Sequence, residues 1–130
     1  MTTPVRIQRR RTKGFDLQAA SRAVNGLPAR CVDRSTWWGN PFRVGTTVSV
    51  RRAKGERIVI AGPIENDAEA IAWFRGMWLA REARSPGLLD RRMAELRGKN
   101  LACFCALDSP CHGDVLLELA KRPIKCEAAE

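Results

Sequence analysis

A short apolar run near the C-terminus, Leu101–Cys105, most constrains how this chain can fold. The run has the length of a strand but lacks the polar alternation of a half-exposed strand, which is typical of a strand buried on both faces. A proline-containing loop at 106–110 follows it, and an apolar helical pattern with Val115 and Leu116 begins at Cys111. We therefore expect this segment to form the central strand of a sheet, followed by a loop and a helix.

The segments before this run alternate between strand-like and helix-like patterns. Strands are predicted at 5–9 and 29–34, a hairpin at 46–52 and 56–60, and helices at 17–25, 67–84, 86–97 and 111–121. Alternating strands and helices are typical of the α/β class. We predict one small α/β domain over residues 1–122, with a mixed sheet, flanking helices and a Rossmann-like strand-loop-helix at its C-terminal end. Residues 123–130 are expected to form a flexible tail.

Length and charge narrow the class of protein. The chain of 130 residues has the size of one domain. No apolar run approaches the roughly 20 residues of a membrane span, and the N-terminus lacks the apolar part of a signal peptide, so we expect a cytoplasmic protein with no membrane partner. Lys and Arg outnumber Asp and Glu by 23 to 14, a formal charge of +9. This excess favours a nucleotide or nucleic acid as partner, although no zinc-finger spacing, leucine zipper or helix-turn-helix accompanies it.

Four cations lie within five residues after the first predicted strand. Arg9, Arg10, Arg11 and Lys13 would occupy the end of that strand and the loop that stops at Gly14. One interpretation is a solvated basic surface, and the other is contact with the phosphate of a ligand. We name the four as candidate phosphate-binding residues.

A loop rich in aromatic residues follows the second predicted strand. Gly39 and a proline exclude regular structure here, yet Trp37, Trp38 and Phe42 place three large rings in it. Such a loop either packs its rings onto the core or offers them to a ligand. In the functional interpretation Trp38 stacks on a base, and Gly39 and Asn40 border it, with Asn40 contacting a polar edge.

The C-terminal cysteines and the single histidine suggest a possible zinc site. Cys103, Cys105, Cys111 and His112 form an acceptable ligand set for zinc. The C-x-C spacing on a strand lacks the tight turn of a C-x-x-C motif, which argues against a metal. We predict no obligatory cofactor and keep zinc as an alternative.

The start of the last predicted helix suggests two other kinds of chemistry. Cys111 could be a thiolate stabilised by the helix N-terminus and His112, although sequence neighbours at a helix start tend to point apart. Alternatively the cysteines are small buried side chains, and His112 with Asp114 forms a polar or anion-binding helix start. We name Cys111, His112 and Asp114 as candidate catalytic residues, and Cys105 and Gly113 as candidate ligand contacts.

Three blocks of the sequence resemble a known family. They are Arg6–Gly14, Trp38–Phe42, and Leu96–Cys105 with the following Pro110–Leu116. Together they are similar to the domain-of-unknown-function family 4326, which is widespread in phages and actinobacteria. The resemblance implies a phage-associated context, with a bacterial host cytoplasm for a phage-encoded chain, and marks the three blocks as a shared site. It implies no reaction.

Our leading hypothesis is a nucleotide- or nucleic-acid-binding α/β enzyme that acts on a base, a glycosidic bond or a phosphate. Its cleft would lie between the Trp38 loop and the helix start at Cys111. The basic run would hold phosphate, Trp38 would stack on the ligand, and Asn40, His112 and Asp114 would make polar contacts or transfer protons. One alternative is a non-enzymatic phage protein that binds nucleic acid or a host protein. A small zinc-stabilised module is another.

Overall fold

The strand β5 (Asn100–Cys103) is the centre of the computed structural model, which describes residues 3–121. All four of its residues are buried, as the missing polar alternation predicts. The other elements, in chain order, are β1 (Arg6–Gln8), α1 (Leu17–Asn25), β2 (Ala29–Cys31), β3 (Val48–Arg51), β4 (Arg57–Ala61), α2 (Asp67–Arg84), α3 (Leu88–Met93) and α4 (His112–Ala120). The predicted tail at 123–130 lies outside the described residues.

The sheet that contains β5 is entirely parallel. Its strand order is β1-β5-β2, and Ala102 pairs with Ile7 on one side and with Cys31 on the other. The antiparallel strands β3 and β4 form a separate hairpin. The α/β class is therefore confirmed, but parallel and antiparallel strands occupy two sheets instead of one. At the base of the hairpin Val48 packs with Ile64 and with Ala70 of α2, which ties the hairpin to that helix and not to the parallel sheet.

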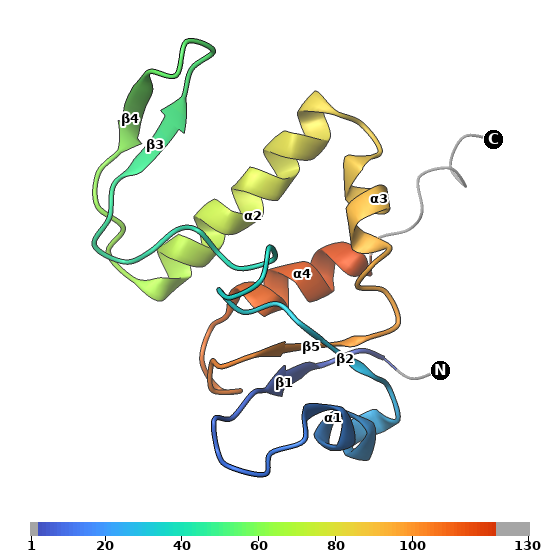
Figure 1. Cartoon of the computed structure of the whole chain (residues 1–130). Coiled ribbons are helices and arrows are strands. Elements are labelled where there is room, and N and C mark those ends of the chain that lie inside the picture. Colours follow the sequence, from blue (N-terminus) through green and yellow to red (C-terminus); the bar gives the residue numbers. More distant parts are fainter. Residues whose placement is uncertain (1–2, 122–130) are drawn as a thin grey trace, which may run out of the picture.

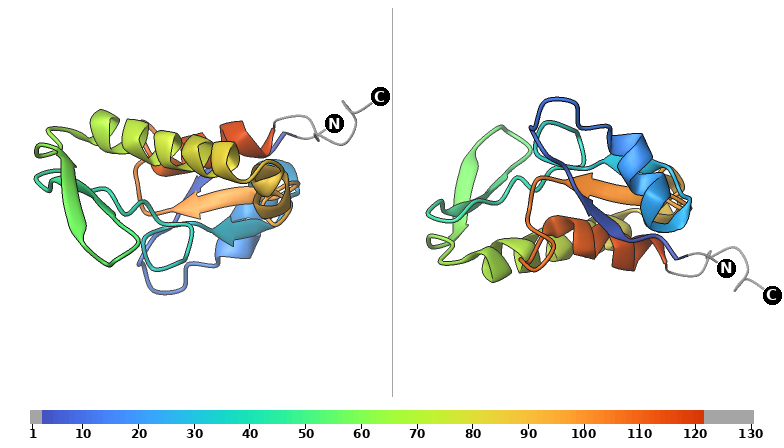
Figure 2. Two further views of the ribbon diagram at one scale, coloured as in Figure 1. Left: turned by 90° about the horizontal axis from the view of Figure 1, so that it is seen from above. Right: turned by 90° about the horizontal axis from the view of Figure 1, so that it is seen from below.

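Helices cover both faces of the parallel sheet. Figure 1 shows α1 on one face and α4 on the other, and Figure 2 shows α2 lying over α4, with the β3–β4 hairpin projecting at one end. Most of the largest buried side chains belong to one cluster on the α4 side of the sheet: Trp38, Trp78, Phe74, Met93, Leu96, Leu101, Leu116 and Leu119. The core therefore lies between the sheet and the three helices α2, α3 and α4.

Most helix ends form where their capping residues predict. Asp16 accepts a hydrogen bond from the Ala19 amide at the start of α1, and Gly26 ends that helix with a φ of 82°. The start of α3 differs from the prediction, since it begins at Leu88 and not at Pro86. The reason is the Glu82 carboxylate, which accepts hydrogen bonds from the amides of residues 87 and 89. These hydrogen bonds hold the segment before Leu88 in a non-helical turn.

A buried asparagine ties the sheet to α1. The Oδ1 atom of Asn100 accepts a hydrogen bond from the Val5 amide at 2.9 Å, and its Nδ2 atom donates to Ser21 Oγ at 2.8 Å. Asn25 and Asn100 also exchange side-chain hydrogen bonds at 2.8 and 2.9 Å. These contacts satisfy a fully buried polar group and fix the register of β1 on β5.

Candidate metal centre and ligand pocket

A pocket of about 490 Å³ opens at the carboxyl ends of the parallel strands. Open α/β sheets bind their ligands at this edge. The loop after β2, the loop after β5, the start of α4 and the first half of α2 surround it. Its lining includes Arg11, Asp33, Arg34, Ser35, Asn40, Asp67, Ile71, Cys103, Phe104, Cys105, Ser109, Cys111 and His112.

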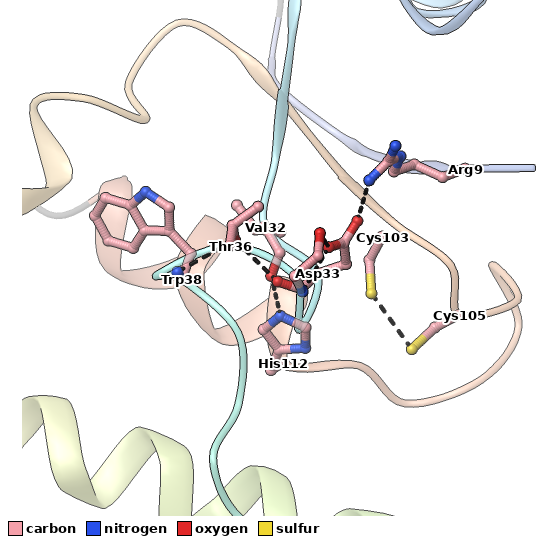
Figure 3. A network of polar contacts seen from close by, with 9 residues as sticks. Arg9, Val32, Asp33, Thr36, Trp38, Cys103, Cys105 and His112 are labelled. Carbon is pink, nitrogen blue, oxygen red and sulfur yellow. Dashed lines mark hydrogen bonds and ion pairs between the residues drawn. The ribbon is translucent and has the colours of Figure 1, made fainter.

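Three cysteines and the histidine meet at the floor of this pocket. The ligand atoms of Cys103, Cys111 and His112 all lie within 4.8 Å of one another, and each of these residues is buried. Cys105 Sγ lies 3.6 Å from Cys103 Sγ, as Figure 3 shows. All three cysteines are free thiols. Three of the four residues named as a possible zinc set, Cys103, Cys111 and His112, therefore lie close enough together to hold one metal ion, and Cys105 adjoins this group through Cys103.

The backbone of the neighbouring strand fixes the histidine ring. His112 Nε2 contacts the Val32 carbonyl oxygen (Figure 3), and a carbonyl only accepts, so Nε2 carries the proton. The lone pair is then on Nδ1, which lies 3.7 Å from Cys111 Sγ. The ring also packs edge-on against Phe74, with centroids 5.4 Å apart. The expectation that Cys111 and His112 point apart is wrong, because Cys111 Sγ and His112 Nδ1 lie side by side.

The three thiols affect one another's ionisation. The neighbouring Cys103 thiol does most to lower the pKa of Cys111, against the effect of burial, and the Gly113 amide lowers it further. Hydrogen bonding to Cys111, followed by burial, raises the pKa of Cys103. Burial, followed by Cys111, raises the pKa of Cys105. Cys111 is thus the most acidic of the three thiols.

Arg6 is a site residue that the sequence pattern did not reveal. Its side chain is only 7% exposed, its Nε atom lies 3.4 Å from Asp114 Oδ1, and its NH2 donates to the carbonyls of Leu107 and Ser109 at 2.8 Å each. Burial would lower the pKa of Arg6, but the Cys111 thiol and Asp114 outweigh it and raise it. Arg6 therefore holds the loop after β5 beside the thiolate.

Asp114 and Gly113, two candidate site residues at the start of α4, contact other protein side chains in the structure. Asp114 has an exposed side chain, faces Arg6 and is absent from the pocket lining, which argues against direct contact with a ligand there. Gly113 is buried, and its amide donates to Cys111 Sγ at 3.4 Å. A Cβ atom at Gly113 would lie 3.3 Å from the Arg6 side chain, so the glycine leaves room for Arg6 to reach the cluster.

The basic run divides into residues with different surroundings. Arg11 lines the pocket and lies over the Phe104 ring, 4.1 Å from its centroid. Arg9 lies over the same ring at 4.7 Å and pairs with Asp33. Arg10 and Lys13 are exposed and outside the pocket lining. Of the four predicted phosphate ligands, Arg11 alone borders the pocket.

The aromatic loop places its two tryptophans in opposite environments. Trp38 is 2% exposed and stacks on Trp78 with centroids 5.7 Å apart, and Figure 3 shows its ring pointing away from the cysteines. It belongs to the hydrophobic core, which corrects the expectation that it stacks on a ligand. Asn40 does line the pocket, but its side chain bonds the Ala70 carbonyl and the Phe42 amide. Asn40 therefore holds the loop against α2.

Gly39 allows this loop to fold back on itself. A Cβ atom at Gly39 would lie 2.5 Å from Arg34 Cα and 2.9 Å from the Asp33 carbonyl oxygen. No side chain fits between two backbone segments at that distance. Gly39 is therefore required for the shape of the loop, and it is absent from the pocket lining, which argues against direct contact with a ligand there.

Asp33 is a pocket residue that sequence reasoning missed. It is buried, lies two residues after the end of β2, pairs with Arg9, and accepts hydrogen bonds from the Ser35 amide and hydroxyl. Burial would raise the pKa of Asp33, but the hydrogen bonds from Ser35 and Arg9 outweigh it and lower the pKa. A polar residue just beyond the end of a parallel strand is the signal that could have identified it.

Comparisons with known proteins identify a family for this chain and no individual relative. The family model Domain of unknown function (DUF4326) matches residues 7–122. Searches of curated proteins and of solved structures found no match. In the described part of the chain, no helix is both long and apolar enough to cross a membrane. Because the family model covers both the parallel sheet and the Cys/His cluster, the chain belongs to the DUF4326 family.

Proposed function

We propose that this domain binds a nucleotide or nucleic acid in the pocket at the end of its parallel sheet, above a zinc ion held by Cys103, Cys105, Cys111 and His112. The observation that carries the zinc is the spacing of the ligand atoms. Tetrahedral zinc with bonds of about 2.3 Å to sulfur and 2.0–2.1 Å to nitrogen separates two sulfurs by about 3.8 Å, and sulfur from nitrogen by about 3.6 Å. The Cys103–Cys105 and Cys111–His112 contacts here are 3.6 and 3.7 Å. The ligand atoms of Cys103, Cys111 and His112 lie within 4.8 Å of one another, and Cys105, outside that group, would move inward to become the fourth ligand.

The environment of each ligand supports the same metal. His112 offers the lone pair of Nδ1 because its other nitrogen donates to the Val32 carbonyl, the usual outer contact of a metal-bound histidine. Zinc binds thiolates, and the lowered pKa of Cys111 favours that form of its side chain. Four protein ligands leave no open position on the ion. Zinc would therefore stabilise the loop after β5 and the floor of the pocket.

Metal content tests this part of the proposal. We expect purified protein to contain one zinc per chain, and Cys111→Ser to lose it. Cys31→Ser is the matched control, because Cys31 is a free thiol outside the cluster and its variant should keep the metal. A folded wild-type protein purified under non-chelating conditions without zinc would contradict the proposal.

The lining of the pocket supports a nucleotide-sized anionic ligand. Arg11 supplies a guanidinium beside the ring of Phe104, and Asp33 and Ser35 supply oxygen atoms for ligand hydroxyl or amino groups. A thermal-shift screen against nucleotides and nucleosides tests this. Arg11→Ala should lose the shift, and Arg10→Ala should keep it, since the neighbouring Arg10 carries the same charge outside the pocket. Equal loss in both variants would indicate general charge attraction only.

A second candidate is an enzyme in which Cys111 acts as a nucleophile. The lowered pKa of Cys111 and its 3.7 Å contact with His112 Nδ1 favour it. The two proposals exclude each other at one atom, because the Nδ1 lone pair cannot both bind zinc and accept a proton. In a metal-free protein, alkylation by iodoacetamide would be fast at Cys111 and slow in His112→Gln. In the zinc form both rates would be low.

A further inference from the structure

Trp37 lies on the side of the aromatic loop that faces away from the core. Its side chain is 61% exposed, against 2% for Trp38. Its ring meets the rings of Trp38 and Trp78 edge-on, with centroids 5.0 and 5.8 Å apart. These two contacts hold a large, exposed ring in a fixed orientation. The same loop lines the pocket through Asp33, Ser35 and Asn40.

One arginine lies over this ring, and two more lie at the end of the helix that carries Trp78. The guanidinium of Arg92, on α3, lies over Trp37 with its carbon 5.3 Å from the ring centroid. Arg81, in the last turn of α2, lies 5.1 Å from the centroid of Trp78, and Arg84 follows in the same turn. We call Trp37, Arg81, Arg84 and Arg92 the Trp37 patch. It joins the end of α2 to α3 and shares none of its residues with the lining of the pocket.

No carboxylate among the described residues pairs with the arginines of the Trp37 patch. The nearest acids in the sequence have other roles: Glu82 accepts backbone amides, and Asp90 pairs with Arg97 at 2.8 Å. Burial lowers the pKa of Arg81, and repulsion from Arg84 and Arg92 lowers it further. The patch therefore holds mutually repelling cations, and a bound anion would relieve that repulsion.

We propose that the Trp37 patch binds single-stranded nucleic acid, with a base on Trp37 and backbone phosphates on Arg81, Arg84 and Arg92. An exposed ring among guanidinium groups matches a ligand that carries both flat bases and phosphates. A duplex hides the faces of its bases, whereas a single strand exposes them. The formal charge of +9 favours the same class of partner. The inference takes its ligand class, nucleotides and nucleic acids, from the proposed function. It specifies the single-stranded polymer as the ligand.

The experiment is fluorescence anisotropy of a labelled single-stranded DNA and a labelled RNA of about 12 nucleotides, within the roughly 4–16 nucleotides that single-strand sites span. Trp37→Ala should weaken binding about 5- to 150-fold, and Trp37→Phe should restore most of it. Arg92→Ala should weaken binding and lower the slope of log affinity against log salt by about 1. Circular dichroism during thermal unfolding checks that each variant is folded.

Arg22→Ala is the matched control, because Arg22 is also a basic residue in the last turn of a helix, α1, on the other face of the sheet. It should bind as the wild type does. The inference is overturned when Trp37→Ala and Arg92→Ala bind as tightly as the wild type, when duplex competes as well as single strand, when polyglutamate competes equally, or when neither oligonucleotide binds.

The pocket is tested separately. Arg11→Ala should lose the thermal shift with mononucleotides while Trp37→Ala keeps it. When only Arg11→Ala weakens oligonucleotide binding, the proposed pocket stands and the Trp37 patch fails. When Trp37→Ala weakens oligonucleotide binding and no mononucleotide shifts the unfolding midpoint, the patch stands and the pocket fails.

Discussion

His112 Nδ1 and Cys111 Sγ lie 3.7 Å apart although the two residues are adjacent in the sequence. The contact arises because Cys111 is the N-cap of α4, with extended backbone, while His112 is the first helical residue. The change of backbone conformation between them turns both side chains to the same side. Two of the four candidate metal ligands thus come from one helix start, and the other two from the end of β5 and the loop after it.

Removal of metal should destabilise the protein. We expect a chelator to lower the midpoint of thermal unfolding by several degrees or more, because each 1 kcal/mol corresponds to about 2–8 °C in domains of ordinary size. Added zinc should restore the midpoint. Cys111→Ser should unfold at a lower temperature and respond to neither reagent, whereas Cys31→Ser should respond as the wild type does. An unchanged wild-type midpoint after complete chelation would contradict a structural zinc.

Gly39 and Gly76 should respond in opposite directions to the same substitution. Gly39→Ala places a Cβ atom 2.5 Å from Arg34 Cα, so the protein must shift its backbone and lose stability. Gly76 lies inside α2, and a Cβ atom added there would have nothing within 4 Å. Gly76→Ala should therefore stabilise by about 0.5–1 kcal/mol through the helix propensity of alanine. Urea unfolding measures both. Equal effects would show that the loop tolerates a side chain at Gly39.

The sequence allowed prediction of the features that depend on local pattern. The buried central strand followed from an apolar run without alternation, and the start of α2 followed from the Asn66 cap. The Cys/His cluster followed in outline because its residues lie within ten positions of one another. The preceding strand and the following helix confine those residues to one edge of the sheet.

The remaining site residues depend on contacts between distant segments. Arg6 and Asp33 meet their partners only through the register of β1 and β2 on β5, and no local pattern contains that register. The roles of Trp37 and Trp38 could not be separated, because adjacent loop residues have no periodicity to decide which ring is buried. In the folded protein Trp38 belongs to the core through its stacking on Trp78.

Asn100 should be important for stability because several side chains and one backbone amide depend on it. Asn100→Ala should lower the free energy of unfolding by at least about 1–3 kcal/mol, since it leaves buried partners unsatisfied. A double-mutant cycle with Ser21→Ala should give a coupling energy of about 0.5–3 kcal/mol. Urea denaturation measures all four proteins. Strictly additive effects would mean that the Ser21–Asn100 hydrogen bond contributes nothing of its own.

Acid should remove the stabilisation that Asp33 provides. The pKa of Asp33 is lower in the folded protein than its ordinary value of 3.8, so its contribution is complete well above pH 3.8 and is lost as the pH falls through the folded pKa. Urea midpoints measured from about pH 5 down to about pH 2 should therefore fall more steeply for the wild type than for Asp33→Asn. Ser35→Ala, which removes one hydrogen bond to the carboxylate, should give an intermediate slope. Identical slopes in all three proteins would contradict this assignment.

The two adjacent tryptophans should separate stability from surface function. Trp38→Ala should destabilise the fold by about 3–5 kcal/mol, because it empties a core position that stacks on Trp78. Trp37→Ala should have a smaller effect, since most of that side chain is already in water and only edge contacts are lost. Phe substitutions at the two positions provide matched controls that keep a ring. The variant Trp38→Phe keeps the exposed Trp37, whereas Trp37→Phe keeps the buried Trp38. An acrylamide quencher should therefore reduce the fluorescence of Trp38→Phe more strongly than that of Trp37→Phe. The reverse order would contradict the burial of Trp38.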